Sequence, residues 1–93
     1  MRRTETYSSV WDALAKTPEQ AANLRARAEL MQKIVTIVKA SDRTQADVAK
    51  QCGVTQPRMN DLLRGRVSRF SLDALVNIAT AIGQRVRVDL EPG

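Results

Sequence analysis

"TQADVAKQCGVTQPRMNDLLRG", residues 44–65, contains two short helical patterns separated by a single glycine. Two helices that cross closely at a tight turn need a small side chain at the contact, which Ala49 provides. They also need a residue that is free to adopt positive φ, which Gly53 provides. The positions that should face inward are all apolar: Val48, Cys52, Val54, Met59 and Leu62. Together these features predict a helix-turn-helix over residues 44–63.

The outward face of the second helix carries side chains suited to reading the edges of base pairs: Gln56, Arg58, Asn60 and Asp61. Gln and Asn can pair bidentately with adenine, Arg with guanine, and Asp can accept a hydrogen bond from cytosine. Arg64, Arg66 and Arg69 follow at a loop, where they could hold phosphates, although ordinary solvated surface is the alternative. Asp61 weighs against purely electrostatic binding, because an acid beside phosphate is unfavourable unless it reads a base or pairs with Arg58.

Capping residues stand at the expected start of each helix: Thr17, Thr44, Thr55 and Ser71. After the first of these caps, Pro18 suits the opening turn of a helix expected over roughly residues 18–40, with a break near Ala28 as the alternative. Its apolar residues recur at steps of three and four: Ala21, Leu24, Ala28, Met31, Val35 and Val38. The last helix is also amphipathic, with one apolar side made of Leu72, Leu75, Val76, Ala79 and Ile82.

The C-terminal stretch "RVRVDLE", residues 85–91, alternates polar and apolar side chains and predicts a strand. One strand in an otherwise helical chain leaves its backbone groups unpaired, so it needs a partner strand. "TETYSSV" at the N-terminus alternates poorly, whereas a second copy paired antiparallel about Val88 sets Arg87 opposite Asp89. The pattern therefore predicts a homodimer, and a two-fold dimer predicts a palindromic DNA site. The expected interface residues are Val86, Arg87, Val88, Asp89 and Leu90.

Composition narrows the function classes. The 93-residue chain has a formal charge of +5, which favours polyanionic partners. It contains no histidine, and Cys52 is its only cysteine, so disulfide scaffolds, Cys/His zinc sites and imidazole-dependent triads are excluded. We expect no enzyme activity, no cofactor and no metal, with Cys52 serving as a small core hydrophobe. The apolar runs are too short for a signal peptide or a membrane span, which favours a cytoplasmic protein.

The N-terminal segment, residues 1–16, is expected to form a separate region. Within it "VWDAL" places three apolar residues at helical spacing: Val10, Trp11 and Leu14. This patch either packs on the chain's own body or docks on another protein. The expected fold class is thus mainly all-α, with this segment, a helical domain over residues 17–83 and a dimerisation strand over residues 84–93.

Residues 44–83 resemble the helix-turn-helix of phage repressor and Cro-type (XRE) regulators through "TQADVAKQCGVTQPRMNDLLRGRVSRFSLDALVNIATAIG". The wider arrangement, with "SSVWDALAKTPEQAANLRARAELM" ahead of the motif and "RVRVDLE" behind it, is similar to HigA-type antitoxins. The resemblance implies a phosphate contact at Gln45 and a base contact at Gln56, the two helix tips. It also implies that Arg58, Asn60 and Asp61 face the major groove. The full set of expected phosphate contacts is Thr44, Gln45, Thr55, Arg64, Arg66 and Arg69.

The same resemblance implies a partner protein as well as DNA. It implies a repressor dimer on a palindromic operator in its own promoter, acting as the antitoxin of a RelE-like (HigB-like) ribonuclease toxin. Val10, Trp11 and Leu14 are then the candidate toxin contact. A stand-alone regulator without a toxin is the alternative, and a protein-interaction module without DNA is a different class. The exposed Gln56, Arg58 and Asn60 disfavour that class, since protein interfaces favour aromatic or aliphatic anchors.

Overall fold

Each α-helix begins at a capping side chain in the computed structural model, which describes residues 15–93. The hydroxyl oxygens of Thr17, Thr44, Thr55 and Ser71 accept hydrogen bonds from backbone N–H groups three residues later, at 3.0–3.2 Å. These bonds satisfy N–H groups that the helix itself leaves without partners. All four predicted helix starts are therefore confirmed.

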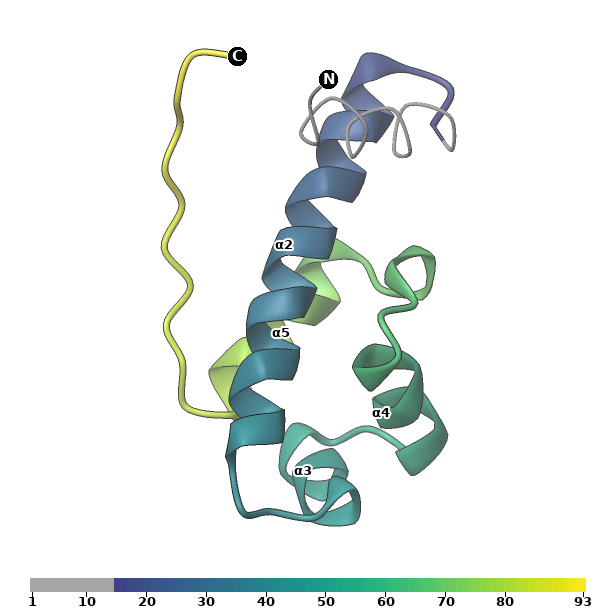
Figure 1. Cartoon of the computed structure of the whole chain (residues 1–93), viewed down its shortest axis with the longest axis vertical. Helices are drawn as coiled ribbons and strands as arrows, with labels where there is room; N and C mark the ends of the chain where they lie inside the picture. Colours follow the sequence, from purple (N-terminus) through teal and green to yellow (C-terminus); the bar gives the residue numbers. More distant parts are fainter. Residues whose placement is uncertain (1–14) are drawn as a thin grey trace.

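Four α-helices and one 3₁₀ helix make up the secondary structure of residues 15–93 (Figure 1). Their bounds are α2 Pro18–Ala40, α3 Gln45–Cys52, α4 Gln56–Leu63, η1 Val67–Arg69 and α5 Leu72–Ala81. The long helix is continuous through Ala28, as the uninterrupted apolar spacing predicted. Sequence patterns missed η1, which is only three residues long and lies in the expected loop. No helix among the described residues is long and apolar enough to cross a membrane.

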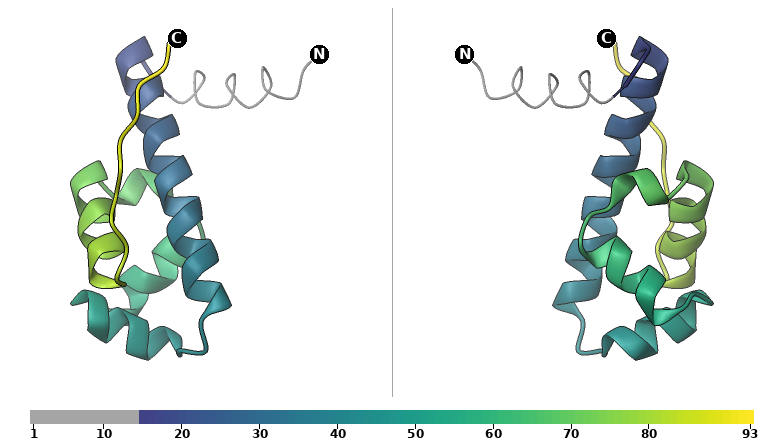
Figure 2. Two further views of the ribbon diagram at one scale, coloured as in Figure 1. Left: turned by 90° about the vertical axis from the view of Figure 1, so that its left-hand side faces the viewer. Right: turned by 90° about the vertical axis from the view of Figure 1, so that its right-hand side faces the viewer.

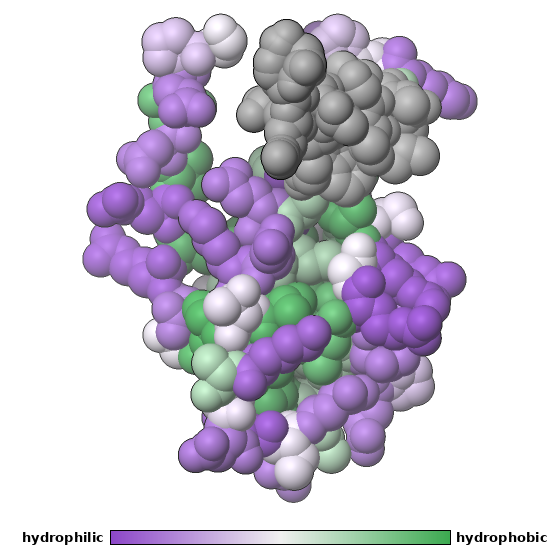
Figure 3. Space-filling view, in the orientation of Figure 1, coloured by the Kyte–Doolittle hydropathy of each residue, from purple (hydrophilic) through white to green (hydrophobic). Residues whose placement is uncertain are grey.

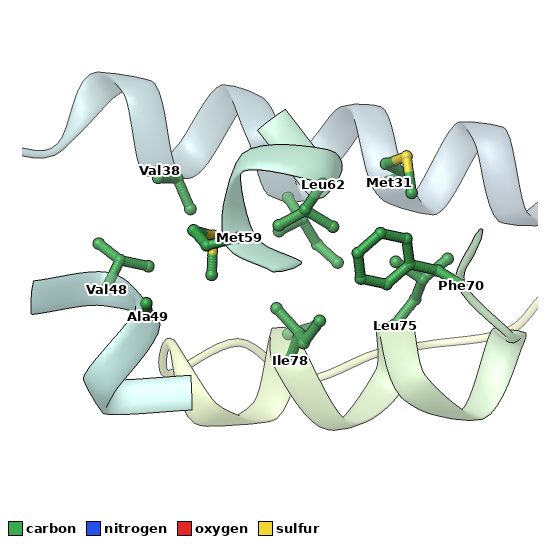
Figure 4. Packing of buried hydrophobic residues seen from close by; sticks show 11 residues of the cluster. Met31, Val38, Val48, Ala49, Met59, Leu62, Phe70, Leu75 and Ile78 are labelled. Carbon is green, nitrogen blue, oxygen red and sulfur yellow. The ribbon is translucent and has the colours of Figure 1, made fainter. Parts of the chain in front are cut away.

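The hydrophobic core lies where α2 and α5 run beside each other and α3 and α4 close one side (Figures 1 and 4). Its largest buried side chains are Phe70, Ile34, Met59, Leu62, Leu75 and Val48. Phe70 comes from the segment between η1 and α5 and points into the space between α2 and α5 (Figure 4). Leu72, expected on the apolar side of α5, is instead 37% exposed, and Ile78 is buried in the core. Helix α5 is thus rotated slightly from its expected orientation.

The predicted strand over residues 85–91 is wrong for the single chain. Residues 84–93 run as an extended tail from the end of α5 toward the N-terminal end of α2 (Figures 1 and 2). No backbone hydrogen bond joins residues 85–93 to another part of the described chain. A strand requires a second extended segment to complete its ladder, and the segments next to the tail are helices, whose backbone groups mostly bond within each helix. Val86 packs against the core, whereas Val88 is 80% and Leu90 is 96% exposed.

The expected N-terminal contact residues, Val10, Trp11 and Leu14, lie outside the described residues.

Candidate nucleic-acid interface

Helices α3 and α4 meet at the tight turn that the sequence predicted. Gly53 has φ of 70°, a left-handed conformation that side chains with a Cβ rarely adopt. Its N–H bonds to the carbonyl of Lys50 at 3.1 Å, and the N–H of Val54 bonds to that of Ala49 at 3.0 Å. Ala49 itself is buried, so its small side chain lets α3 approach the core closely. The helix-turn-helix over residues 44–63 is confirmed.

Buried apolar residues fix the orientation of the two short helices. Val48 of α3 and Met59 and Leu62 of α4 are buried, while Cys52 and Val54 are half-buried against the same cluster. Burial raises the pKa of the Cys52 thiol above its ordinary value, and the charge of Arg43 opposes the shift. The thiol therefore stays protonated at neutral pH and acts as a small hydrophobe. With these residues inward, the opposite side of α4 faces solvent.

The tips of α3 and α4 are joined by a side-chain contact. Gln45 donates through Nε2 to the backbone carbonyl of Gln56 at 3.3 Å. Thr44 and Thr55 use their hydroxyl oxygens as acceptors in the caps, so each O–H hydrogen remains available to an acceptor outside the protein. The N-terminal ends of both helices therefore present hydrogen-bond donors on neighbouring positions of one surface.

Two amide side chains on α4 are free to contact a ligand. Gln56 and Asn60 are exposed, and within residues 15–93 neither side chain makes a hydrogen bond. They lie four positions apart, which places them one turn apart on the same side of the helix. Arg64, at the C-terminal end of α4, is likewise exposed. This part of α4 matches the outward face expected from the sequence.

Arg58 is oriented toward the protein and is only partly exposed. Its guanidinium carbon lies 4.2 Å from the centre of the Phe70 ring, a cation–π contact. Its NH1 group donates to the backbone carbonyl of Arg69 at 3.1 Å. These two contacts hold the Arg58 side chain in one orientation. Since the hydrogen bond uses only one of its five guanidinium donors, the others remain available to another partner.

Asp61 pairs with two of the arginines expected to hold phosphates. Its Oδ1 accepts from Arg66 at 3.3 Å, and its Oδ2 accepts from Arg69 at 3.1 Å. The sequence suggested Arg58 as its partner, but Arg58 is engaged with Phe70 and the Arg69 carbonyl. The expected base contact and two expected phosphate contacts therefore form one ion-paired cluster.

The segment of residues 64–70, here called the arginine loop, is also held from the other side by α2. Arg27 donates through NH1 to the carbonyl of Phe70 at 3.1 Å and to that of Val67 at 3.4 Å. Sequence reasoning missed both Arg27 and Phe70. The carbonyls that Arg27 contacts are 40 and 43 positions away in the sequence, and Phe70 lies in a loop without periodicity. The only local signal is that Arg27 adjoins the apolar side of the long helix.

An apolar groove lies beside the C-terminal end of α4. It has a volume of about 310 Å³ and lies between α2 and the C-terminal end of α4, next to hydrophilic residues (Figure 3). Its lining is mainly aliphatic, with Gln32 and Arg64 as its polar members: Ala28, Met31, Gln32, Val35, Leu63, Arg64, Gly65 and Val67. No group of three or more His, Cys, Asp or Glu residues in the described part of the chain could hold a metal ion.

Comparison with known protein families identifies the same part of the chain as a helix-turn-helix domain. A protein-family model described as a helix-turn-helix domain matches residues 13–91. This match spans the four α-helices of residues 15–93, the arginine loop and most of the extended tail. No match is found among curated proteins.

Proposed function

The chain belongs to this helix-turn-helix domain family, and on that basis we propose that it is a transcriptional repressor that binds double-stranded DNA sequence-specifically. One observation carries the proposal: α4 presents the free amides of Gln56 and Asn60 on its solvent side, directly beside the arginine loop. Amide side chains on an exposed helix can hydrogen-bond base edges in the major groove, while neighbouring arginines bind phosphates. This arrangement supports α4 as the recognition helix.

In the proposed complex, α4 lies in the major groove. Gln56 and Asn60 pair with bases, and Arg58 reads guanine with the donors that Phe70 and Arg69 leave free. The backbone contacts that fix the register come from the helix tips and the arginine loop: Thr44, Gln45, Thr55, Arg64, Arg66 and Arg69.

The proposed repressor is a homodimer joined through its extended tail. Val88 and Leu90 are exposed, and the tail backbone lacks partners within the described chain. A second copy paired antiparallel about Val88 would complete the ladder and cover both side chains. Two recognition helices related by a two-fold axis would then suit half-sites about 34 Å apart, so the operator should be palindromic.

A narrower proposal is that the repressor is the antitoxin of a type II toxin–antitoxin pair, with a RelE-like ribonuclease as its toxin. Its support is the resemblance of the whole arrangement to HigA-type antitoxins, with Val10, Trp11 and Leu14 as the candidate contact. The alternative is a stand-alone XRE-type regulator. Co-expression with the product of an adjacent small reading frame separates the two, because only an antitoxin relieves growth arrest.

DNA selection tests the main proposal. Selection from a random duplex library should enrich a palindromic sequence, and fluorescence anisotropy then gives the affinity of each variant for it. Asn60→Ala and Gln56→Ala should each weaken binding by about 1–3 kcal/mol and relax base preference. Asn23→Ala is the matched control, because Asn23 is an exposed amide of α2 outside the helix-turn-helix. Failure to enrich any sequence, or equal effects of Asn60→Ala and Asn23→Ala, would contradict the proposal.

A further inference from the structure

Asp61 is the only acidic residue between Gln56 and Phe70, a stretch that also contains Arg58, Arg64 and two further arginines. An acidic side chain on a surface that binds phosphates is unfavourable unless it has a specific role. The contacts of Asp61 indicate what that role is.

Three hydrogen bonds connect Asp61 to the arginine loop. Its backbone carbonyl accepts from the N–H of Arg66 at 3.1 Å, and its two carboxylate oxygens accept from Arg66 at 3.3 Å and Arg69 at 3.1 Å. Arg69 is held at its backbone too, because its carbonyl accepts from Arg58. Both arginines are thus fixed relative to the recognition helix α4 before any ligand binds.

The exposure of the three side chains separates their roles. The Asp61 side chain is 20% exposed, whereas those of Arg66 and Arg69 are 39% and 56% exposed. A carboxylate that already accepts on both oxygens and is largely covered is poorly suited to reach a cytosine in the groove. Each arginine spends one of five donors on Asp61 and can direct the others outward.

We propose that Asp61 is a specificity-determining residue that acts through Arg66 and Arg69 and not on a base; this inference rests on the DNA-binding function proposed above. On random DNA, the negative charge of Asp61 offsets the attraction of the two arginines for phosphate and restrains their side chains. On the operator, the contacts of α4 fix a register in which the restrained arginines reach phosphates while they remain paired. Asp61 therefore weakens binding to random DNA more than binding to the operator.

The test compares Asp61→Asn with the unaltered chain on two probes, the selected operator duplex and a random-sequence duplex of equal length. Asp61→Asn should raise the affinity for the random duplex by about two- to tenfold, the effect expected when two partly exposed ion pairs are released. The salt dependence on that duplex should steepen by roughly one to two units as the arginines gain phosphates. Operator affinity should change less, so the ratio of the two affinities falls.

Controls isolate the route through the arginines. Glu29→Gln removes the same charge and an exposed ion pair with Lys33 on α2, and should leave the ratio unchanged. Asp61→Glu keeps the charge and should retain most of the ratio. In an Arg66→Gln/Arg69→Gln background, Asp61→Asn should no longer raise affinity for the random duplex. Circular dichroism melts verify that each variant is folded. Arg69→Gln alone, which releases one of the two ion pairs of Asp61, gives a second measurement of the affinity ratio.

Each other outcome decides against the inference. Loss of operator affinity with unchanged random affinity after Asp61→Asn would identify a base reader. An unchanged ratio, or an effect that persists in the Arg66→Gln/Arg69→Gln background, would show that Asp61 does not act through these arginines. If the unaltered chain enriches no sequence and binds neither probe, the proposed function itself is wrong.

Discussion

The arginine loop and the extended tail are both short, arginine-containing segments, yet the chain holds them very differently. The loop contacts α2 through Arg27 and α4 through Arg58 and Asp61, and Phe70 fixes it in the core. The tail has one half-buried anchor, Val86, and beyond it a solvent-exposed ion pair between Arg87 and Asp89 at 3.6 Å. One chain suffices to organise the loop, whereas the tail backbone beyond Val86 makes no hydrogen bond to another part of the described chain.

Substitution of one apolar residue in each segment should reveal this contrast most strongly. Phe70→Ala removes a side chain that is 1% exposed and also removes the ring under Arg58, so it should destabilise the fold by about 3–5 kcal/mol. Leu90→Ala, the matched change on the tail, should stay within about 0.5 kcal/mol. Urea denaturation of the two variants measures both, at a concentration low enough to keep the chain monomeric. Comparable losses would mean that the tail belongs to the folded core.

Val88→Pro tests the proposed role of the tail in dimer formation separately from the folding of the helical domain. Proline removes the N–H that a central ladder position needs, so the proposed dimer should dissociate. Because each half-site then binds independently, operator affinity should fall by about 100-fold or more, while the helical domain melts as before. Analytical ultracentrifugation gives the oligomeric state. A variant that stays dimeric with full operator affinity would exclude the tail as the interface.

The smallest expected effect concerns the helix start that leads into the loop. Thr55→Ala removes the oxygen that caps α4 at the Arg58 N–H and should destabilise the chain by about 1 kcal/mol. Thr55→Ser retains a capping hydroxyl and should restore most of the loss. Thermal denaturation monitored by circular dichroism distinguishes the two. If the serine variant is as unstable as the alanine variant, the methyl group and not the cap carries the effect.

Local features of the fold were predictable from the sequence because their causes are local. A capping hydroxyl acts on an N–H three residues away, and the left-handed Gly53 is needed by its own turn, so the helix starts and the turn followed directly from the residues. The burial of Phe70 was not predictable, because a loop residue has no periodic neighbours that indicate an inward direction. The strand over residues 85–91 was expected from alternation alone, but alternation specifies only a preference for extended backbone. A ladder also needs a partner.

The candidate site was also predictable from the sequence only in part. The spacing on α4 predicted which amides would be exposed, and Gln56 and Asn60 are. It did not predict that Arg58 would lie on Phe70 or that Asp61 would pair with Arg66 and Arg69. Those partners depend on how η1 turns the chain back toward α4, which is a property of the packed domain.

The direction of the tail has a practical meaning for experiments on this molecule. Gly93 lies at the end of the domain where α2 begins, and α3 lies at the opposite end (Figure 1). A fluorophore or surface tether attached at Gly93 is therefore remote from the helix-turn-helix and should leave duplex capture undisturbed. The same probe would test the proposed homodimer, since paired tails would bring two such labels within energy-transfer range. One labelling position can thus separate assembly from DNA capture in a single titration.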